Sequence, residues 1–323
     1  MAKLDLKDRK ILYELDLNCR QSNTQIGKKV GLKKDVVAYR IKRMQEEGVI
    51  RNFWTAINTF KLGYNVFRIY INFQNVTSKI RAEIIQYFVN HTNSWAVISV
   101  KGEIDLNVII WVKDIYEFYL FWEKTLGKYG EFFSKSAISI FIYANAYEKS
   151  YLLSEEYKKS DRLLYKITCG GKTIEIDKID YQILNEIAVN ARIPLIKLAE
   201  KVGTSSQTIN YRLNNLIKNG VIQAFRVGID ISKLGLEKFV IQIYLKEQKQ
   251  RRSLIDYLQL LPYIEYIDIA LGWSDLQIEV IIENINSLTQ IMDQIVTNFP
   301  NAIKNQNIHI ATQYHKERWL PLI

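Results

Sequence analysis

Basic and amide side chains recur on one face of two short helical segments, and these side chains are the best candidates for chemistry in the 323-residue chain. In each segment, apolar residues at helical spacing form a stripe that should face a core: Val37, Ile41 and Met44 in the first, and Ile209, Leu213 and Leu216 in the second. The opposite face of the first segment is mainly basic and carries Lys33, Lys34, Tyr39, Lys42 and Arg43. The corresponding face of the second segment is polar and almost uncharged and carries Ser206, Gln207, Asn210, Tyr211 and Asn214.

These two faces predict contact with double-stranded DNA. Lysine and arginine bind phosphates without reading sequence, whereas Gln, Asn and Ser can hydrogen-bond to base edges. We therefore expect the first face to supply most of the salt-dependent affinity and the second to supply more of the base discrimination. A solvated helix face is the commoner explanation for any single polar helix, but its recurrence in two equivalent segments favours DNA. The sequence leaves open whether Arg40 and Arg212 join these faces or bind an acidic partner such as Asp8 or Asp180.

The overall charge agrees with an anionic partner. The formal net charge is +10, which favours nucleic acid. A membrane surface would call for a basic amphipathic helix with a bulky apolar face, and the sequence shows none. Because no signal peptide is evident and no run approaches the ~18 apolar residues of a membrane helix, we expect a cytoplasmic protein without membrane contact.

Catalytic and metal-binding signatures are sparse, so we expect neither an enzyme nor a cofactor. The three histidines, His91, His309 and His315, have no metal-ligand spacing, and no phosphate loop or nucleophile elbow is present. Cys19 and Cys169 are too few and too isolated for a disulfide framework.

The elements that must position the two faces belong to an internal repeat. Asp5 aligns with Asp177, an offset of 177 − 5 = 172, and about a third of positions 5 to 63 are identical in the two copies. Each copy begins with three short helices and a strand, and Gly31 or Gly203 forms the tight turn before the third helix. This order is typical of a helix-turn-helix whose second helix of the pair enters the major groove.

The rest of each copy has the order βαββαβ. We therefore predict an α+β chain in which two winged helix-turn-helix domains alternate with two ferredoxin-like (ACT-like) sensor domains. The predicted boundaries are 1–63, 64–149, 174–235 and 236–323, with a linker at 150–173 that is rich in Lys, Ser and Glu.

Three motifs resemble the Lrp/AsnC family of regulators. The Asp-x-x-Asp-x-x-Ile-Leu run, Asn-x-Arg and Gly-x-Ile occur in order in both copies and begin at residues 5, 18 and 48 in the first. The resemblance covers almost the whole chain twice and implies a sensor that binds a small effector such as an amino acid. The family's Gly-x-x-Asp turn corresponds here to Gly102 and Asp105, and to Gly272 and Asp275. A plain strand turn with a solvated aspartate is an equally good interpretation of these four residues.

The chain departs from the family in carrying two units. This allows either an intramolecular pseudo-dimer or a homodimer. An aromatic run predicted to lie partly at a domain or subunit contact comprises Tyr116, Phe118, Tyr119, Phe121 and Trp122.

Two alternatives share the fold or the charge. Siroheme decarboxylases resemble Lrp/AsnC proteins, but the strand at 94–99 lacks the histidine of their His-Asn-Tyr segment. A chromosome-organising protein that binds DNA without sequence preference is the other alternative.

Overall fold

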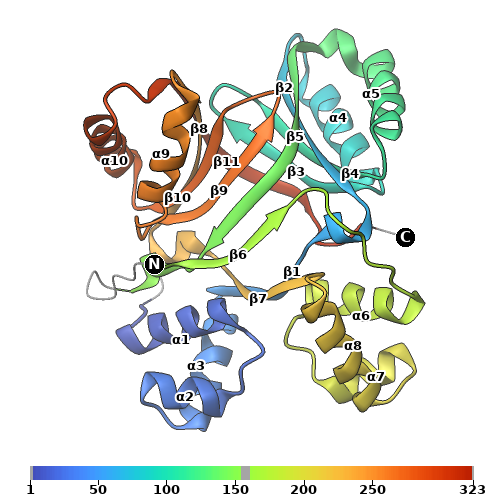
Figure 1. Cartoon of the computed structure of the whole chain (residues 1–323), viewed down its shortest axis with the longest axis vertical. Helices are drawn as coiled ribbons and strands as arrows, with labels where there is room; N and C mark the ends of the chain where they lie inside the picture. The colour runs from blue at the N-terminus through green and yellow to red at the C-terminus, as the bar shows by residue number, and fades with distance from the viewer. Residues whose placement is uncertain (1–2, 154–160, 322–323) are drawn as a thin grey trace.

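The computed structural model describes residues 3–153 and 161–321 and confirms an α+β chain with two helix-turn-helix units. Both helix-turn-helix units lie together below a β-barrel, and helices flank the barrel on two sides (Figure 1). The gap in the description falls within the predicted linker. No helix in the described ranges is long and apolar enough to cross a membrane.

Each helix-turn-helix contains three helices whose ends follow from local chemistry. The helices are α1 (Leu6–Leu17), α2 (Asn23–Val30) and α3 (Lys34–Glu46) in the first unit, and α6 (Lys178–Val189), α7 (Leu195–Val202) and α8 (Ser206–Lys218) in the second. Asp5 and Asp177 cap α1 and α6 through reciprocal capping boxes. Gly31 and Gly203 end α2 and α7 with φ of 69° and 75°, a left-handed conformation that glycine adopts without strain.

The two units exchange a strand. β1 (Ile50–Ile57) pairs antiparallel with β7 (Ile222–Ile229), and Trp54 lies opposite Arg226 in this ribbon. β1 lies against α6, where the Thr55 hydroxyl donates to the carbonyl of Ile187 at 2.7 Å, and β7 lies against α1. The packing therefore crosses the sequence boundary predicted at residue 63.

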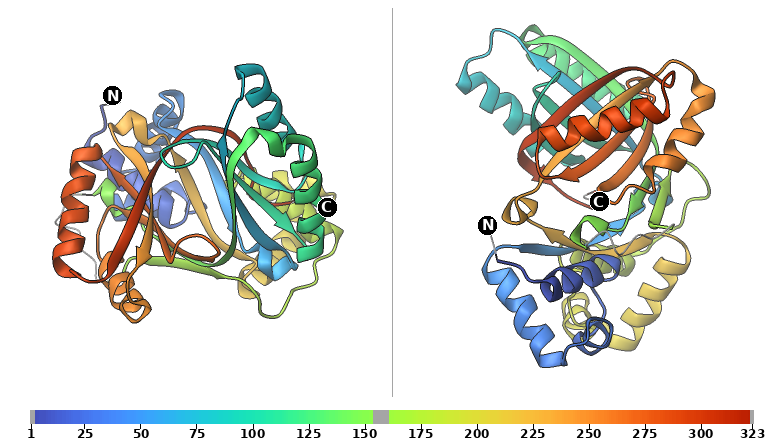
Figure 2. Two further views of the ribbon diagram at one scale, coloured as in Figure 1. Left: turned by 90° about the horizontal axis from the view of Figure 1, so that it is seen from above. Right: turned by 90° about the vertical axis from the view of Figure 1, so that its left-hand side faces the viewer.

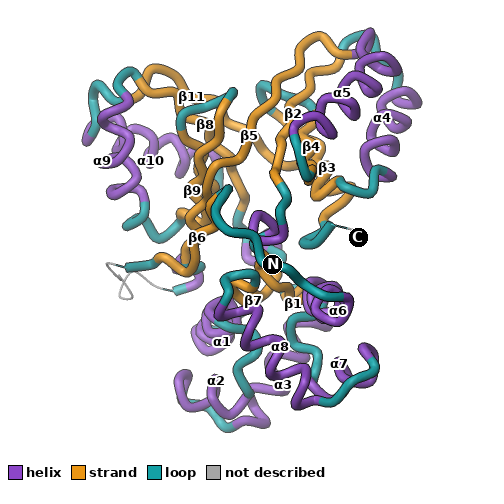
Figure 3. The backbone as a smooth tube through the Cα atoms, turned by 45° about the vertical axis from the view of Figure 1, so that its right-hand side comes forward, coloured by secondary structure: helices purple, strands orange, loops and turns teal. Residues whose placement is uncertain are grey.

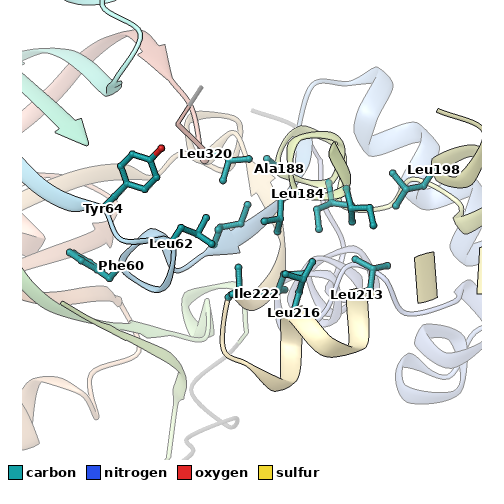
Figure 4. Packing of buried hydrophobic residues seen from close by; sticks show 14 of the residues in the cluster. Phe60, Leu62, Tyr64, Leu184, Ala188, Leu198, Leu213, Leu216, Ile222 and Leu320 are labelled. Atoms are coloured by element: carbon teal, nitrogen blue, oxygen red, sulfur yellow. The ribbon is translucent and has the colours of Figure 1, made fainter. Parts of the chain in front are cut away.

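The second helix-turn-helix core shows this exchange directly. Leu184, Leu213 and Leu216 pack with Phe60 and Leu62, which belong to the first copy (Figure 4). The last two lie in the short 3₁₀ helix η1 (Thr59–Leu62) that follows β1. The first helix-turn-helix core likewise includes Ala191 and Val227 of the second copy, so the two helix-turn-helix units are held in one arrangement.

The sensor domains have the predicted βαββαβ order. The first contains β2 (Asn65–Phe73), α4 (Ser78–Asn90), β3 (Ser94–Lys101), β4 (Leu106–Val112), α5 (Ile115–Tyr129) and β5 (Phe133–Tyr147). The second contains β8 (Glu237–Leu245), α9 (Arg251–Leu258), β9 (Ile264–Leu271), β10 (Leu276–Ile282), α10 (Ile285–Asn298) and β11 (Ile303–Glu317).

The two sensor sheets close into one barrel. β3 pairs with β11 and β5 pairs with β9, all antiparallel, so that β2-β4-β3-β11-β8-β10-β9-β5 form a ring within the described residues (Figure 2). The helices α4 and α5 cover one side of the ring, and α9 and α10 cover the other (Figures 1 and 2). The two copies thus associate within one chain as a pseudo-dimer.

The linker contributes a strand that follows the first sensor domain. β6 (Leu163–Thr168) pairs with the outer edge of β5 from Tyr143 to Tyr147. The aromatic run on α5 divides as the helix period requires: Phe118 and Trp122 are buried in the first sensor core, whereas Tyr116 and Tyr119 are exposed.

Candidate DNA-binding surface and the junctions behind it

The outer face of α3 is exposed and basic. Lys33, Lys34 and Lys42 are exposed, and Tyr39 is 66% exposed, while Val37, Ile41 and Met44 are buried beneath them. Lys42 approaches Glu46 only to 3.6 Å on the helix surface. The lysine ammonium groups are therefore available to an anionic partner, because an exposed pair of this kind is weak.

The outer face of α8 is equally exposed and carries amides. Gln207, Asn210 and Asn214 are exposed and Ser206 is half-buried. Tyr211 is 67% exposed and occupies the position equivalent to Tyr39. Ser205 caps the start of α8, because its hydroxyl accepts from the Thr208 amide at 3.1 Å, whereas Lys33 before α3 makes no side-chain cap.

The structure decides the role left open for Arg40 and Arg212. Arg40 donates through Nη1 to Asp5 at 2.7 Å and to Asp8 at 2.8 Å. Arg212 makes the same pair of contacts, at 2.7 Å to Asp177 and 3.0 Å to Asp180. Each arginine thus fixes its recognition helix to the first helix of its own unit.

The Arg–Asp contacts, which we call the arginine clamps, shift the pKa values of the groups that form them. The pKa of Arg40 is raised because its guanidinium donates to Asp5 and Asp8. Burial raises the pKa of Asp5, but hydrogen bonds from Arg40 and from the backbone outweigh this and lower it overall. Arg43 is also drawn toward the helix interface, because its Nη2 lies 2.6 Å from Asp8. It is less available to DNA than the three lysines.

The two glycines of the Gly-x-x-Asp turns lie where the two sensor domains meet. A Cβ added to Gly102 would approach the carbonyl oxygen of Ile308 on β11 to 2.4 Å, and one added to Gly272 would approach that of Ile138 on β5 to 2.6 Å. These glycines therefore permit close packing between the domains.

The two aspartates of these turns are held by their own domain. Asp105 accepts from the Phe73 amide at 2.8 Å and from Arg81 at 3.2 Å. Asp275 accepts from the Leu245 amide at 2.7 Å and from the side chain of Gln248.

Sequence reasoning missed a buried ion-pair network behind the first helix-turn-helix. Asp16 on α1 accepts two hydrogen bonds of 2.9 Å from Arg226 on β7, and both residues are fully buried. Arg226 also donates to the hydroxyl of Tyr266 on β9 at 2.8 Å. Lys149, which follows β5, binds Glu265 on β9. We call these five residues the ion-pair junction, since they join the barrel to α1 and the ribbon.

The charged groups of this junction shift one another's pKa values. Burial by itself lowers the pKa of Arg226, but the carboxylate of Asp16 outweighs it and holds this pKa well above its ordinary value. Burial beside the Arg226 cation lowers the pKa of Lys149 to about 7.

The equivalent junction behind the second helix-turn-helix is aromatic. The offset of 172 in the DNA-binding units (226 − 54; 188 − 16) places Trp54 and Ala188 where the first junction has Arg226 and Asp16. In the second half of the sensors the offset is 170 (319 − 149; 265 − 95), and Trp319 and Trp95 replace Lys149 and Glu265.

The rings of this tryptophan junction are in contact. Trp54 and Trp319 stack with centroids 3.9 Å apart, and Trp95 meets Trp319 edge-on at 6.0 Å. An alignment of the two copies could have revealed both junctions, because charged residues of one copy align with tryptophans of the other.

A cavity of about 640 Å³ lies between the ribbon and the barrel, and residues of both junctions line it. Its walls come from β1 and β7 of the ribbon and from β8, β9 and β11 of the barrel. The ribbon thus forms one wall of the cavity. It also packs against α1 and α6 below the barrel (Figure 3).

Comparisons with known proteins agree with this architecture. A family model described as winged helix-turn-helix DNA-binding matches residues 4–51 and 176–223. An HTH-type transcriptional regulator of Pyrococcus abyssi is 27% identical over 120 residues, which cover 36% of this chain and 80% of the relative. The structure of AsnC from E. coli is 25% identical with a TM-score of 0.41, and the match covers 46% of this chain and 99% of AsnC.

One solved structure matches both copies together. The siroheme decarboxylase NirDL has a TM-score of 0.63 and 10% sequence identity, and the match covers 96% of this chain and 92% of NirDL. At this identity the likeness shows a shared fold. The repeated match shows two winged helix-turn-helix DNA-binding modules in tandem, and the curated relatives that match one copy at a time are HTH-type transcriptional regulators.

Proposed function

We propose that the protein is a sequence-specific transcriptional regulator that acts in the cytoplasm by placing α3 and α8 in the major groove of double-stranded DNA. The observation that carries the proposal is the matched pair of exposed helix faces, each clamped from behind by an Arg–Asp contact. A rigidly held helix presents its side chains to base edges at little entropic cost on binding.

The two helices divide the work of binding. Lys33, Lys34 and Lys42 on α3 neutralise phosphates, which supplies affinity that falls with salt. Asn210 and Asn214 on α8 offer amide groups, which can bind adenine through two hydrogen bonds. The tyrosines at equivalent positions, Tyr39 and Tyr211, add contacts that both half-sites share.

A small effector such as an amino acid would adjust this activity. The Gly-x-x-Asp turns remain one predicted location, because they lie between the two sensor domains. The satisfied carboxylates of Asp105 and Asp275 argue for a structural role, so an effector there would have to displace existing hydrogen bonds.

A siroheme-decarboxylase-like enzyme is the second candidate, and the whole-chain likeness to NirDL is the observation that favours it. Mixing the protein with a tetrapyrrole and recording the visible spectrum distinguishes the two. A shifted absorption band at stoichiometric concentrations would support the enzyme, and an unchanged spectrum supports the regulator.

Selection of bound duplexes from a random-sequence library at near-physiological salt tests the proposal. We expect one enriched sequence with two half-sites about one helical turn apart. Retention of DNA without enrichment would instead indicate a chromosome-organising protein, and failure to retain DNA would refute the regulator.

A further inference from the structure

The cavity beside the ion-pair junction has walls suited to a ligand with a flat apolar body. Trp54, Trp319, Tyr151, Tyr266 and Tyr314 all line it. Trp54 and Trp319 are stacked on each other, and Tyr314 is 43% exposed. Its volume of about 640 Å³ falls within the range of small-molecule sites.

Along one side of the cavity runs a strand edge that no strand of the described residues covers. β11 pairs with β8 only from Ile303 to Ile310, and beyond that point its only partner in the described residues is β3. The equivalent stretch of β5, from Tyr143 to Tyr147, is covered by β6. Thr312 and Gln313 on this edge of β11 line the cavity, and no strand of the described residues lies over them.

Larger rings occupy the equivalent space on the other side of the molecule. With the offset of 170 (281 − 111; 317 − 147), Trp111 stands where the cavity wall has Ile281, and Tyr147 stands where it has Glu317. Both rings are 1% exposed, and Trp111 stacks on Trp95 at 5.4 Å. Among the described residues, the two copies thus differ at this cavity, because these rings fill the equivalent space in the other copy.

The charges around the cavity leave a carboxylate without a counter-ion. Arg51 lies 3.0 Å from Asp230, Lys238 lies 2.7 Å from Glu279, and Lys149 is paired as described above. Each lining cation therefore has an anionic partner.

Glu317 lines the same cavity, and its side chain makes no ion pair or hydrogen bond with the residues that the structure describes. Glu317 is exposed to solvent, and partial desolvation in the cavity raises its pKa, although Lys238 and Arg51 partly offset this. An unpaired carboxylate among aromatic rings is the environment that an ammonium group prefers.

We propose that this cavity binds one small organic amine, with its ammonium group at Glu317 and its apolar body against Trp54 and Trp319. A ligand here touches the ribbon that joins both DNA-binding units. This regulatory consequence rests on the proposed DNA-binding function, whereas the binding site itself does not.

Calorimetric titration with 4-phenylbutylamine and tryptamine tests the site, with 4-phenylbutyrate and indole-3-propionate as charge-reversed probes of the same shape. We expect at least one amine to bind once per chain. The acids should bind at least about tenfold more weakly, because they lose a charge-assisted hydrogen bond and meet a like charge.

Substitution of the carboxylate tests the assignment to Glu317. Glu317→Gln keeps the shape and should weaken amine binding by about tenfold, whereas Glu123→Gln on exposed α5 is the matched control and should not. Equal melting temperatures of the two variants establish that both are folded.

Three results would overturn the site: no heat with either amine, equal affinity for amines and acids, or unchanged affinity in Glu317→Gln. Because these titrations contain no DNA, they can succeed when the duplex selection fails, and the reverse. If both succeed, the amine should change the affinity for the selected duplex at least about threefold, within the range of typical coupling energies.

Discussion

The two junctions between the barrel and the DNA-binding units lie at equivalent positions, but one is built from buried charges and the other from aromatic rings. At the ion-pair junction, α1 meets the ribbon through Asp16 and Arg226, which are both fully buried. At the tryptophan junction, α6 presents Ala188 and the ribbon presents Trp54. In a symmetric homodimer both junctions would have to be identical. Fusion of the two copies removes that constraint, and each junction has become specialised.

The helices α3 and α8 also differ between the two copies, as the two junctions do. Lysines dominate the exposed face of α3 and amides that of α8, although the arginine clamps behind them are equivalent. The retained clamps show which contacts the fold requires, while the divergent faces show where the copies are free to differ. The following predictions test this contrast.

Breaking the buried ion pair should have the largest effect on stability. Arg226→Met leaves the Asp16 carboxylate buried without its partner and should lower the free energy of unfolding by about 3–5 kcal/mol. Urea unfolding followed by circular dichroism measures this loss. The double variant Asp16→Leu, Arg226→Met should recover much of it, because no isolated charge remains. A double variant as unstable as the single one would contradict the assignment.

Removing a ring from the tryptophan junction should have a smaller effect. Trp319 is only partly buried, so Trp319→Ala should cost about 2–3 kcal/mol, below the range for a fully buried tryptophan. The same urea experiment reports it. Trp319→Phe, which keeps a stackable ring, is the control and should retain more than half of the lost stability.

The ion-pair junction should also make stability depend on pH. Burial beside Arg226 lowers the pKa of Lys149 to about 7, whereas an unfolded lysine titrates near 10.4. Between these values the unfolded chain holds a proton that the folded chain does not, so stability rises with pH across this window. Relative to Lys149→Met, the wild type should therefore gain stability from pH 7 to pH 10, and a flat difference would refute the lowered pKa.

The contrast between recognition helices predicts separable effects on DNA binding. Replacing Lys33, Lys34 and Lys42 by alanine should reduce the slope of log affinity against log salt by about 2–3. Replacing Asn210 and Asn214 by alanine should leave that slope unchanged and reduce the preference for the selected duplex over a scrambled one by about 1–3 kcal/mol per lost base contact. Fluorescence anisotropy at several salt concentrations measures both quantities.

Local patterns made the elements and the DNA-binding face predictable. The helix periods around Ile41 and Ile209, the glycine turns and the strand alternation in the sensors depend on residues close in sequence. The sequence also limited Arg40 to two roles, contact with DNA or with an acidic partner, because the partner Asp8 belongs to the same helix-turn-helix unit.

The pairing between copies could not be predicted in this way. Nothing near β1 indicates that its partner is β7, and ladders between distant segments leave no local periodic signal. β6 lies in a segment whose composition is typical of a linker. Lys149 and Glu265 look like surface charges until the barrel closes around them.

Dimethyl sulfate footprinting of guanine N7 on the selected duplex tests the central claim, that both helices bind the major groove. The account predicts two protected patches about one helical turn apart. The patch assigned to α3 should be lost in the triple lysine variant, and the other should be lost in the double asparagine variant. A single patch, or protection that neither variant changes, would contradict it.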